Sequence, residues 1–416
     1  MSRIHAEILS IDPLVADVLR RYWEQDDELK FPHKARQLAS ELRIMTHQFS
    51  ALVREQTRAV VPEWTCPRCG EPGPVNSRAD YQQQGSTRRW SQARGHAGPV
   101  CASCHGQEAE RKAFAAAQEE QAKRTRLWRR YWPRPLPTRE PERCSIADLV
   151  FLVALTRAGA SEDLAWIAPL HTLPDRLSPT AEFDEKVLLH LNGRCLTSVH
   201  TGSTFSAFEW DEKGEPGGFM VGEVFWTIGK DPEEAREFVR RAEALLKSDS
   251  WPERWLREIP TLWREVLVEE CLQYLAWALD KHRLPFRPGL KTRMTFGNVL
   301  DQFSLGQVYN MTLRKTKDAA AAFQSRELSS QQHAANTVPG SIQRFADYAR
   351  ANDWSVYLYR RNPGVPQSFV SSVFFDTALR LGEYAFTTPL TVAEEEMDSL
   401  LRQRFETGTS FPLEFS

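Results

Sequence analysis

The chain is organised around Cys66-Pro-Arg-Cys69-Gly-Glu-Pro-Gly73 and, further along, Cys101-Ala-Ser-Cys104-His-Gly106. A Cys-x-x-Cys turn brings two thiolates together, and two such turns supply the four sulfur ligands of a closed tetrahedral zinc site. Pro67, Gly70 and Gly106 are residue types that tight turns favour. The spacing therefore predicts a structural Zn²⁺ held by Cys66, Cys69, Cys101 and Cys104.

These two turns, here called the first knuckle (Cys66–Cys69) and the second knuckle (Cys101–Cys104), resemble the zinc ribbon family. In that family two such turns clamp the base of a β-hairpin. The resemblance covers residues 61–108. The insert Val75–Val100 is polar, contains Arg88, Arg89 and Arg94, and has no apolar run long enough to form a core. We therefore expect the metal to order this insert.

Two other uses of the cysteines are less consistent with the sequence. Disulfides form in oxidising compartments, but the N-terminus Met-Ser-Arg-Ile-His-Ala-Glu has no apolar signal-peptide region, and seven cysteines is an odd number. A thioredoxin-type redox site would use one Cys-x-x-Cys within a βαβ pattern. His96 or His105 would replace a cysteine ligand only if the four-sulfur shell were incomplete.

Composition predicts a multidomain, mainly helical α+β protein. A chain of 416 residues is too long for one ordinary core. No apolar run reaches the length of a membrane span, so we expect no membrane partner. With no signal-peptide region either, we expect a cytoplasmic protein. Residues 66–143 carry fifteen Lys/Arg and eight Asp/Glu, a balance of +7; with a net charge of −2, the remainder carries −9. A basic module on an acidic body favours a polyanion bound at one end.

Residues 1–60 are similar to a helix-turn-helix. An amphipathic helix is predicted from Asp12 to Gln25. In Lys34–Glu55, Leu38, Ala39 and Leu42 would face the core from one helix, Ile44 would fill the turn, Thr46 would cap the next helix, and Phe49, Leu52 and Val53 would pack back. The pattern departs from the family at Arg43, where the turn usually has Gly.

If the second helix of this pair enters a major groove, its outward face contacts DNA. That face would include Gln48, Ser50 and Arg54, with Gln48 and Arg54 the best candidates for base edges. The alternative is a helical hairpin that packs against the next domain.

Residues 109–143 are predicted to form a long basic helix and a proline linker. The span Gln107–Trp132 has almost no helix breakers, and its end is basic and aromatic, with Arg124, Arg129 and Arg130 as candidate phosphate contacts. A solvated helix end would have the same composition. The linker Pro133–Pro141 marks the clearest domain boundary.

Two further domains are predicted. Residues 144–230 would contain helices at Ile146–Arg157, Glu162–Leu170 and Ser178–Leu191, then a hairpin around Asp211–Gly214, which is the element order of a winged helix. Residues 231–416 would be mostly helical. Their predicted features include a helix break at Pro339-Gly340, a strand at Val356–Tyr359, the basic stripe Arg314, Lys315, Lys317 and the basic pair Arg360-Arg361.

No catalytic residue is assigned. Phosphate-binding Gly-rich loops, Gly-x-Ser-x-Gly elbows and His-Glu-x-x-His helices are absent from the sequence. Glu209, Asp211 and Lys213 resemble the carboxylate-plus-lysine set of metal-dependent nucleases, yet they also suit an ordinary turn.

The sequence thus favours a zinc-containing protein that binds double-stranded DNA. A transcription regulator and a component of a mobile element or of antiviral (phage) defence fit equally, with the C-terminal body binding a protein partner or another protomer. The alternatives are a non-enzymatic scaffold subunit that docks proteins through its zinc module and, third, a metal-dependent nuclease.

Overall fold

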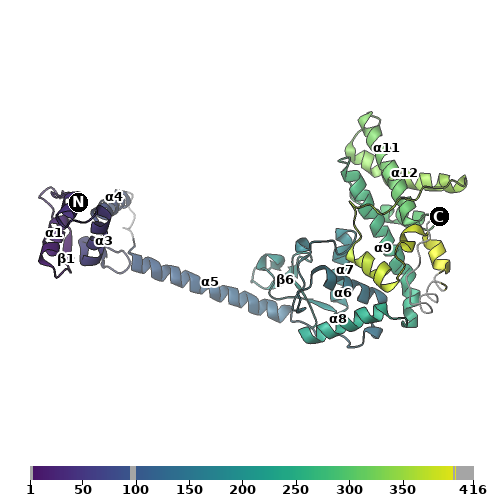
Figure 1. Ribbon diagram of the computed structural model, residues 1–416, viewed down its shortest axis with the longest axis horizontal. Helices are drawn as coiled ribbons and strands as arrows, with labels where there is room; N and C mark the ends of the chain where they lie inside the picture. The colour runs from purple at the N-terminus through teal and green to yellow at the C-terminus, as the bar shows by residue number, and fades with distance from the viewer. Residues whose placement is uncertain (1–2, 94–99, 397–398, 400–416) are drawn as a thin grey trace. The chain divides into compact units, whose positions relative to one another are not determined.

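The computed structural model describes residues 3–93, 100–396 and 399 (Figure 1). The chain forms two compact units, Met1–Ala122 and Lys123–Ser416, here called the N-terminal and C-terminal units. The described residues are mainly helical, with small antiparallel sheets. The predicted fold class is confirmed at this level.

The N-terminal unit begins with the helices predicted from apolar spacing: α1 (Pro13–Trp23), α2 (Ala35–Glu41) and α3 (Thr46–Gln56). Asp12 caps α1 by accepting from the amide of Leu14 at 2.8 Å. The small side chain of Ala39 is buried where α2 meets α3, as predicted. The buried face of these helices consists of Val18, Leu19, Tyr22, Trp23, Leu38, Ala39, Phe49 and Val53.

The turn between α2 and α3 contains Arg43 at the position where a helix-turn-helix usually has glycine, and Arg43 adopts the conformation that glycine would have there. Arg43 has a φ of 57°, in the left-handed region. The amide of Ile44 donates to the carbonyl of Ala39 at 3.1 Å, and the amide of Arg43 to that of Ser40 at 3.1 Å, which together close the end of α2. Thr46 is not the cap: the cap residue is Met45, whose amide donates to the side chain of Gln48 at 2.9 Å.

A three-stranded antiparallel sheet completes this core. Strand β1 (His5–Ile8) pairs with β2 (Thr57–Thr65), which pairs with β3 (Pro72–Pro74). The predicted boundary at residue 60 therefore falls within β2. The order of three helices followed by a hairpin, predicted for residues 144–230, occurs in this unit.

The described part of the insert, residues 75–93, packs against the helical core, which corrects the expectation that only metal would hold the insert. It contains α4 (Arg78–Ala93), and Tyr81 is buried with its ring stacked on Trp64 at 5.0 Å between centroids. The guanidinium of Arg78 lies 4.3 Å from the ring centre of Tyr22. These contacts join the insert to the core of α1–α3.

The predicted long helix is present as α5 (Ala102–Arg130), and it starts at the second knuckle instead of after it. In the N-terminal unit, the α5 residues after Cys104 are exposed, apart from a half-buried Glu108. In the C-terminal unit, Leu127 on α5 is buried.

The first part of the C-terminal unit differs from the winged-helix prediction. Helices α6 (Ile146–Gly159) and α7 (Ala181–Gly193) are confirmed, but a helix over Glu162–Leu170 is wrong. Ile167 instead exchanges backbone hydrogen bonds with Trp226 at 2.8 and 3.0 Å, which holds this segment extended. Strands β4 (Thr197–Val199) and β7 (Trp226–Ile228) pair, as do β5 (Phe208–Trp210) and β6 (Pro216–Phe219) around the predicted turn.

Helices form the rest of this unit: α8 (Pro232–Lys247), α9 (Glu253–Asp280), α10 (Leu290–Leu300), α11 (Leu305–Gln324), α12 (Gln331–Ala351), α13 (Phe369–Ser371), the π-helical turn η4 (Ser372–Ala378) and α14 (Tyr384–Thr387). The predicted break at Pro339-Gly340 is wrong, because α12 continues through Pro339, with Val338 and Ile342 buried on either side. Val356–Tyr359 is not a strand. Within the described ranges, no helix is both long and apolar enough to span a bilayer.

Candidate metal centre

The four predicted ligands converge. The sulfur atoms of Cys66, Cys69, Cys101 and Cys104 all lie within 4.8 Å of one another. Cys69 Sγ and Cys101 Sγ are 3.8 Å apart. Tetrahedral zinc with Zn–S bonds of about 2.3 Å requires sulfur atoms about 3.8 Å apart. The donor set and its spacing therefore fit Zn²⁺.

The first knuckle forms the tip of the β2–β3 hairpin. The amide of Cys66 donates to the carbonyl of Glu71 at 2.8 Å, and the amide of Gly70 donates to the carbonyl of Cys66 at 2.9 Å. Gly70 has a φ of 74°, a conformation that glycine adopts without steric cost. This turn points Cys66 and Cys69 toward the same side of the hairpin tip.

The second knuckle is the first turn of α5. The amide of His105 donates to the carbonyl of Cys101 at 2.9 Å, in the helical pattern. This differs from the zinc ribbon expectation, because only the first knuckle lies on a hairpin. The exposed ring of His105 is not part of the sulfur cluster, and His96 lies outside the described residues.

Backbone amides and burial give the thiols different proton affinities. The amides of Cys101 and Arg68 each lie 3.4 Å from the sulfur of Cys66. The hydrogen bond from the Cys101 amide, then that from the Cys69 amide, lower the pKa of Cys66 to about 6. Burial raises the pKa of Cys104 to about 12. A bound zinc ion would hold both groups as thiolates.

The candidate DNA contacts on α3 are exposed. Gln48, Ser50 and Arg54 are all exposed, as predicted for the outward face of the second helix. The side-chain oxygen of Gln48 accepts from the amide of Met45 at 2.9 Å, and its NH₂ group is the donor that could contact DNA. The hydroxyl of Ser50 donates to the carbonyl of Thr46 at 3.0 Å, and Nε of Arg54 donates to the carbonyl of Ser50 at 3.3 Å.

The candidate cations on α4 have different surroundings. Arg88 is half-buried beside Trp64, donates to the carbonyl of Thr65 at 3.2 Å, and has a pKa lowered by burial. Arg89 is exposed, with its Nε 3.3 Å from the carbonyl of Gly85. Arg94 lies outside the described residues.

At the end of α5, Arg124 has a structural role that the sequence did not indicate. Its guanidinium donates to the carbonyls of Thr201 and Ser203 at 2.8 and 2.7 Å and lies 4.3 Å from the ring centre of Phe205. Arg129 and Arg130 are exposed. These two remain the candidates for phosphate contact.

The nuclease-like residues form a turn. One carboxylate oxygen of Asp211 accepts from the amides of Lys213 and Glu215, at 2.9 and 2.8 Å. This arrangement shapes the tip of the β5–β6 hairpin. These hydrogen bonds give Asp211 a structural role that requires no metal.

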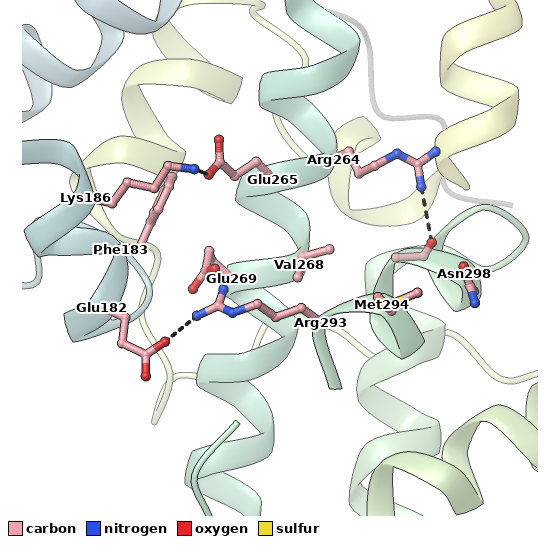
Figure 2. A pocket seen from close by; sticks show the side chains of 11 residues that line it. Glu182, Phe183, Lys186, Arg264, Glu265, Val268, Glu269, Arg293, Met294 and Asn298 are labelled. Atoms are coloured by element: carbon pink, nitrogen blue, oxygen red, sulfur yellow. Dashed lines mark hydrogen bonds and ion pairs between the residues drawn. The ribbon is translucent and has the colours of Figure 1, made fainter. Parts of the chain in front are cut away.

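A groove of about 600 Å³ between α7, α9 and α10 was not predicted (Figure 2). Its charged lining is internally paired: Glu182 accepts from Arg293 at 2.5 Å, Arg264 meets Asp301 at 2.5 Å, Lys186 pairs with Glu265, and Arg293 also pairs with the buried Glu269. Figure 2 shows Lys186 directed at Glu265 and Glu182 at Arg293. Because every charged lining residue has a partner, we assign these ion pairs to holding the helices together.

Comparisons of this chain with protein-family models, with curated proteins and with solved structures found no match.

Proposed function

We propose that this protein binds double-stranded DNA through its N-terminal unit, in which zinc has a structural role. The α2–turn–α3 arrangement carries the proposal. Leu38, Ala39, Phe49 and Val53 are buried on one face, while the opposite face of α3, including His47, Ser50 and Arg54, is polar and exposed. A helix presented in this way fits a major groove.

The residues of α3 would have distinct roles. Arg54 is exposed, and a guanidinium can donate two parallel hydrogen bonds to guanine. Gln48 would mainly fix the start of α3 through its hydrogen bond with Met45. Arg36, at the start of α2, and Arg43, in the turn, are exposed and would contact phosphates.

The hairpin that follows α3 supports the same proposal. Three helices followed by a hairpin is the element order of a winged helix, and the tip of this hairpin carries the first zinc knuckle. Zinc would therefore fix the hairpin tip to the start of α5. Arg68, partly exposed at the tip, would then lie in a fixed position for a phosphate contact.

Salt dependence tests the proposal. In gel-shift titrations with random duplex DNA, binding should weaken steeply as salt rises, because bound phosphates release counterions. Arg54→Ala should weaken binding by about 1–3 kcal/mol to the sequence that the wild type selects from the random duplexes. Arg58→Ala, an exposed arginine on β2, is the matched control. Absence of salt-dependent binding would favour the scaffold alternative.

A separate assay addresses the nuclease alternative. The protein should not nick duplex DNA in the presence of Mg²⁺. Nicking that is abolished by Asp211→Ala would show chemistry at the β5–β6 turn and contradict the structural assignment of this turn.

A further inference from the structure

Helices α11 and α12 lie side by side in the C-terminal unit (Figure 1) and enclose a groove of about 590 Å³. Its lining includes Lys315 on α11 and Ser341, Arg344, Phe345 and Tyr348 on α12. The ammonium group of Lys315 lies 5.0 Å from the ring centre of Phe345. The groove thus combines an aromatic wall with cations.

Large aromatic side chains continue from this groove onto the surface. Tyr348 is 54% exposed, Trp354 is 54% exposed and Tyr357 is 74% exposed. The rings of Tyr348 and Trp354 meet edge to face, 5.0 Å apart. Exposed aromatic residues that contact one another, as Tyr348 and Trp354 do, mark interaction sites more often than single exposed side chains do.

The backbone holds these aromatic residues in place. The amide of Trp354 donates to the carbonyl of Ala349 at 2.8 Å, across a turn in which Asp353 has a φ of 56°. The following segment is attached to α11, because Asn310 donates to the carbonyl of Tyr357 at 3.0 Å. The rings are therefore presented from an ordered surface, which lowers the entropic cost of binding.

The chain segment that carries these aromatic residues is basic. Residues 305–360 carry seven Lys/Arg and four Asp/Glu, a balance of +3, whereas residues 144–416 as a whole carry 29 and 37, a balance of −8. In the described part of the chain, no carboxylate lies within ion-pair distance of the exposed side chains of Arg314, Lys317, Arg344, Arg350 and Arg360. Asp318, by contrast, pairs with Lys315 at 2.8 Å.

We propose that Tyr348, Trp354 and Tyr357, with the cations around the α11–α12 groove, bind single-stranded nucleic acid. Stacking on Tyr and Trp requires exposed base faces, which a duplex hides within its helix. Phosphates between the stacked bases would meet Arg344, Arg350 and Arg360. A small anion would use the cations but leave the aromatic residues without a role.

This surface lies in the C-terminal unit and is independent of the proposed duplex site on α3. The test uses the full chain, a fluorescein-labelled oligothymidylate of about 16 nucleotides and fluorescence anisotropy. Tyr348→Ala, Trp354→Ala and Tyr357→Ala should each weaken binding about fivefold or more, the loss expected for one stacked base. Trp166→Ala, at a 40% exposed tryptophan elsewhere in the unit, should bind like the wild type.

The second part of the test varies the charge of the surface and compares single-stranded with duplex DNA. Arg350→Glu should weaken oligothymidylate binding and reduce its salt dependence, whereas Arg287→Glu, at another exposed arginine, should not. Arg54→Ala should leave this binding intact, which separates it from the duplex site. Failure to bind the oligonucleotide, unchanged affinity in the aromatic variants, or equal competition by duplex DNA would each overturn the proposal.

Discussion

The guanidinium of Arg68, in the first zinc knuckle, donates to the carboxylate of Glu108, on α5, at 2.9 Å. The same nitrogen lies 3.4 Å from the carbonyl of Cys104, in the second knuckle. Glu108 also accepts from Lys112 at 2.8 Å. The two halves of the metal centre are thus connected outside the sulfur shell as well as through it.

The Arg68–Glu108 ion pair should contribute far less to zinc affinity than the cysteine ligands do. The Arg68–Glu108 pair is partly exposed, so Glu108→Gln should cost at most about 1 kcal/mol, or about fivefold in zinc affinity. Cys104→Ser should abolish stoichiometric zinc, because it removes a ligand. Zinc transfer to a chromophoric chelator measures both, with Cys195→Ser, outside the cluster, as the control. Full zinc content in Cys104→Ser would contradict the assigned ligand set.

The number of protons released when zinc binds should depend on pH. With a pKa of about 12, Cys104 is protonated at neutral pH and must lose its proton to bind zinc. With a pKa of about 6, Cys66 is already a thiolate above that pH and releases a proton only below it. Zinc affinity should therefore rise with pH, most steeply below about pH 6. Calorimetry in two buffers with different ionisation enthalpies counts these protons, and a constant count across pH 6 would contradict the assignment to Cys66.

Replacing Arg43 by glycine should stabilise the N-terminal unit. The left-handed conformation at this position is costly for arginine and not for glycine, so Arg43→Gly should raise the free energy of unfolding by about 1 kcal/mol. Arg36→Gly, the same change inside α2, should lower it by about 1 kcal/mol. Urea denaturation measures both, and equal effects of the two changes would contradict the role of backbone conformation.

The arginines at the end of α5 should separate into binding and structural classes. The double change Arg129→Ala and Arg130→Ala should weaken duplex binding about equally for all sequences and reduce its salt dependence, with little change in thermal stability. Arg124→Ala should lower the melting temperature, because the carbonyls of Thr201 and Ser203 lose their donor. An unchanged salt dependence in the double variant would exclude these two residues from the DNA contact.

The buried pair of Glu270 and Arg361 should be costly to break. Arg361 donates to the buried carboxylate of Glu270 at 2.7 Å, and the hydroxyl of Tyr309 donates to the same oxygen at 3.2 Å. Burial raises the pKa of Tyr309 well above its usual value, so it remains a donor. Arg361→Met should lower the free energy of unfolding by about 3–5 kcal/mol, because it leaves a buried unpaired charge.

A second substitution shows whether that charge is responsible. Adding Glu270→Gln to Arg361→Met should recover part of the loss. Arg380→Met, at an arginine paired with the exposed Asp249, should cost at most about 1 kcal/mol. A double variant no more stable than Arg361→Met would show that packing, not charge, sets the cost.

Local spacing in the sequence was sufficient where one element determines its own geometry. The Cys-x-x-Cys pairs identified a cluster that the structure brings together. Helices α2 and α3 followed from the small Ala39 and the apolar residues around it, and the conformation of Arg43 followed from its place in the turn. The helices and the turn depend on neighbours within a few residues. The meeting of Cys69 and Cys101, 32 residues apart, was predictable because a closed zinc site needs four ligands.

Features that depend on distant contacts were missed. Apolar residues in Glu162–Leu170 suggested a helix, but Ile167 bonds to Trp226, far along the chain. The insert Val75–Val100 has no apolar run long enough to form a core, yet its Tyr81 stacks on Trp64. In the sequence, the basic residues of α11 lie far from those of the segment after α12. Their relation to Tyr348 and Trp354 required the packing of the two helices.

The second knuckle also bears on how α5 forms. Fixing the first turn of any helix is unfavourable, and each later residue adds only a small gain. The α5 residues that follow Cys104 in the N-terminal unit are largely in solvent, so tertiary packing contributes little to starting them. A metal ion bound by Cys101 and Cys104 would act as the nucleation template of this helix. Removing it should make the solvated turns fray from their amino end.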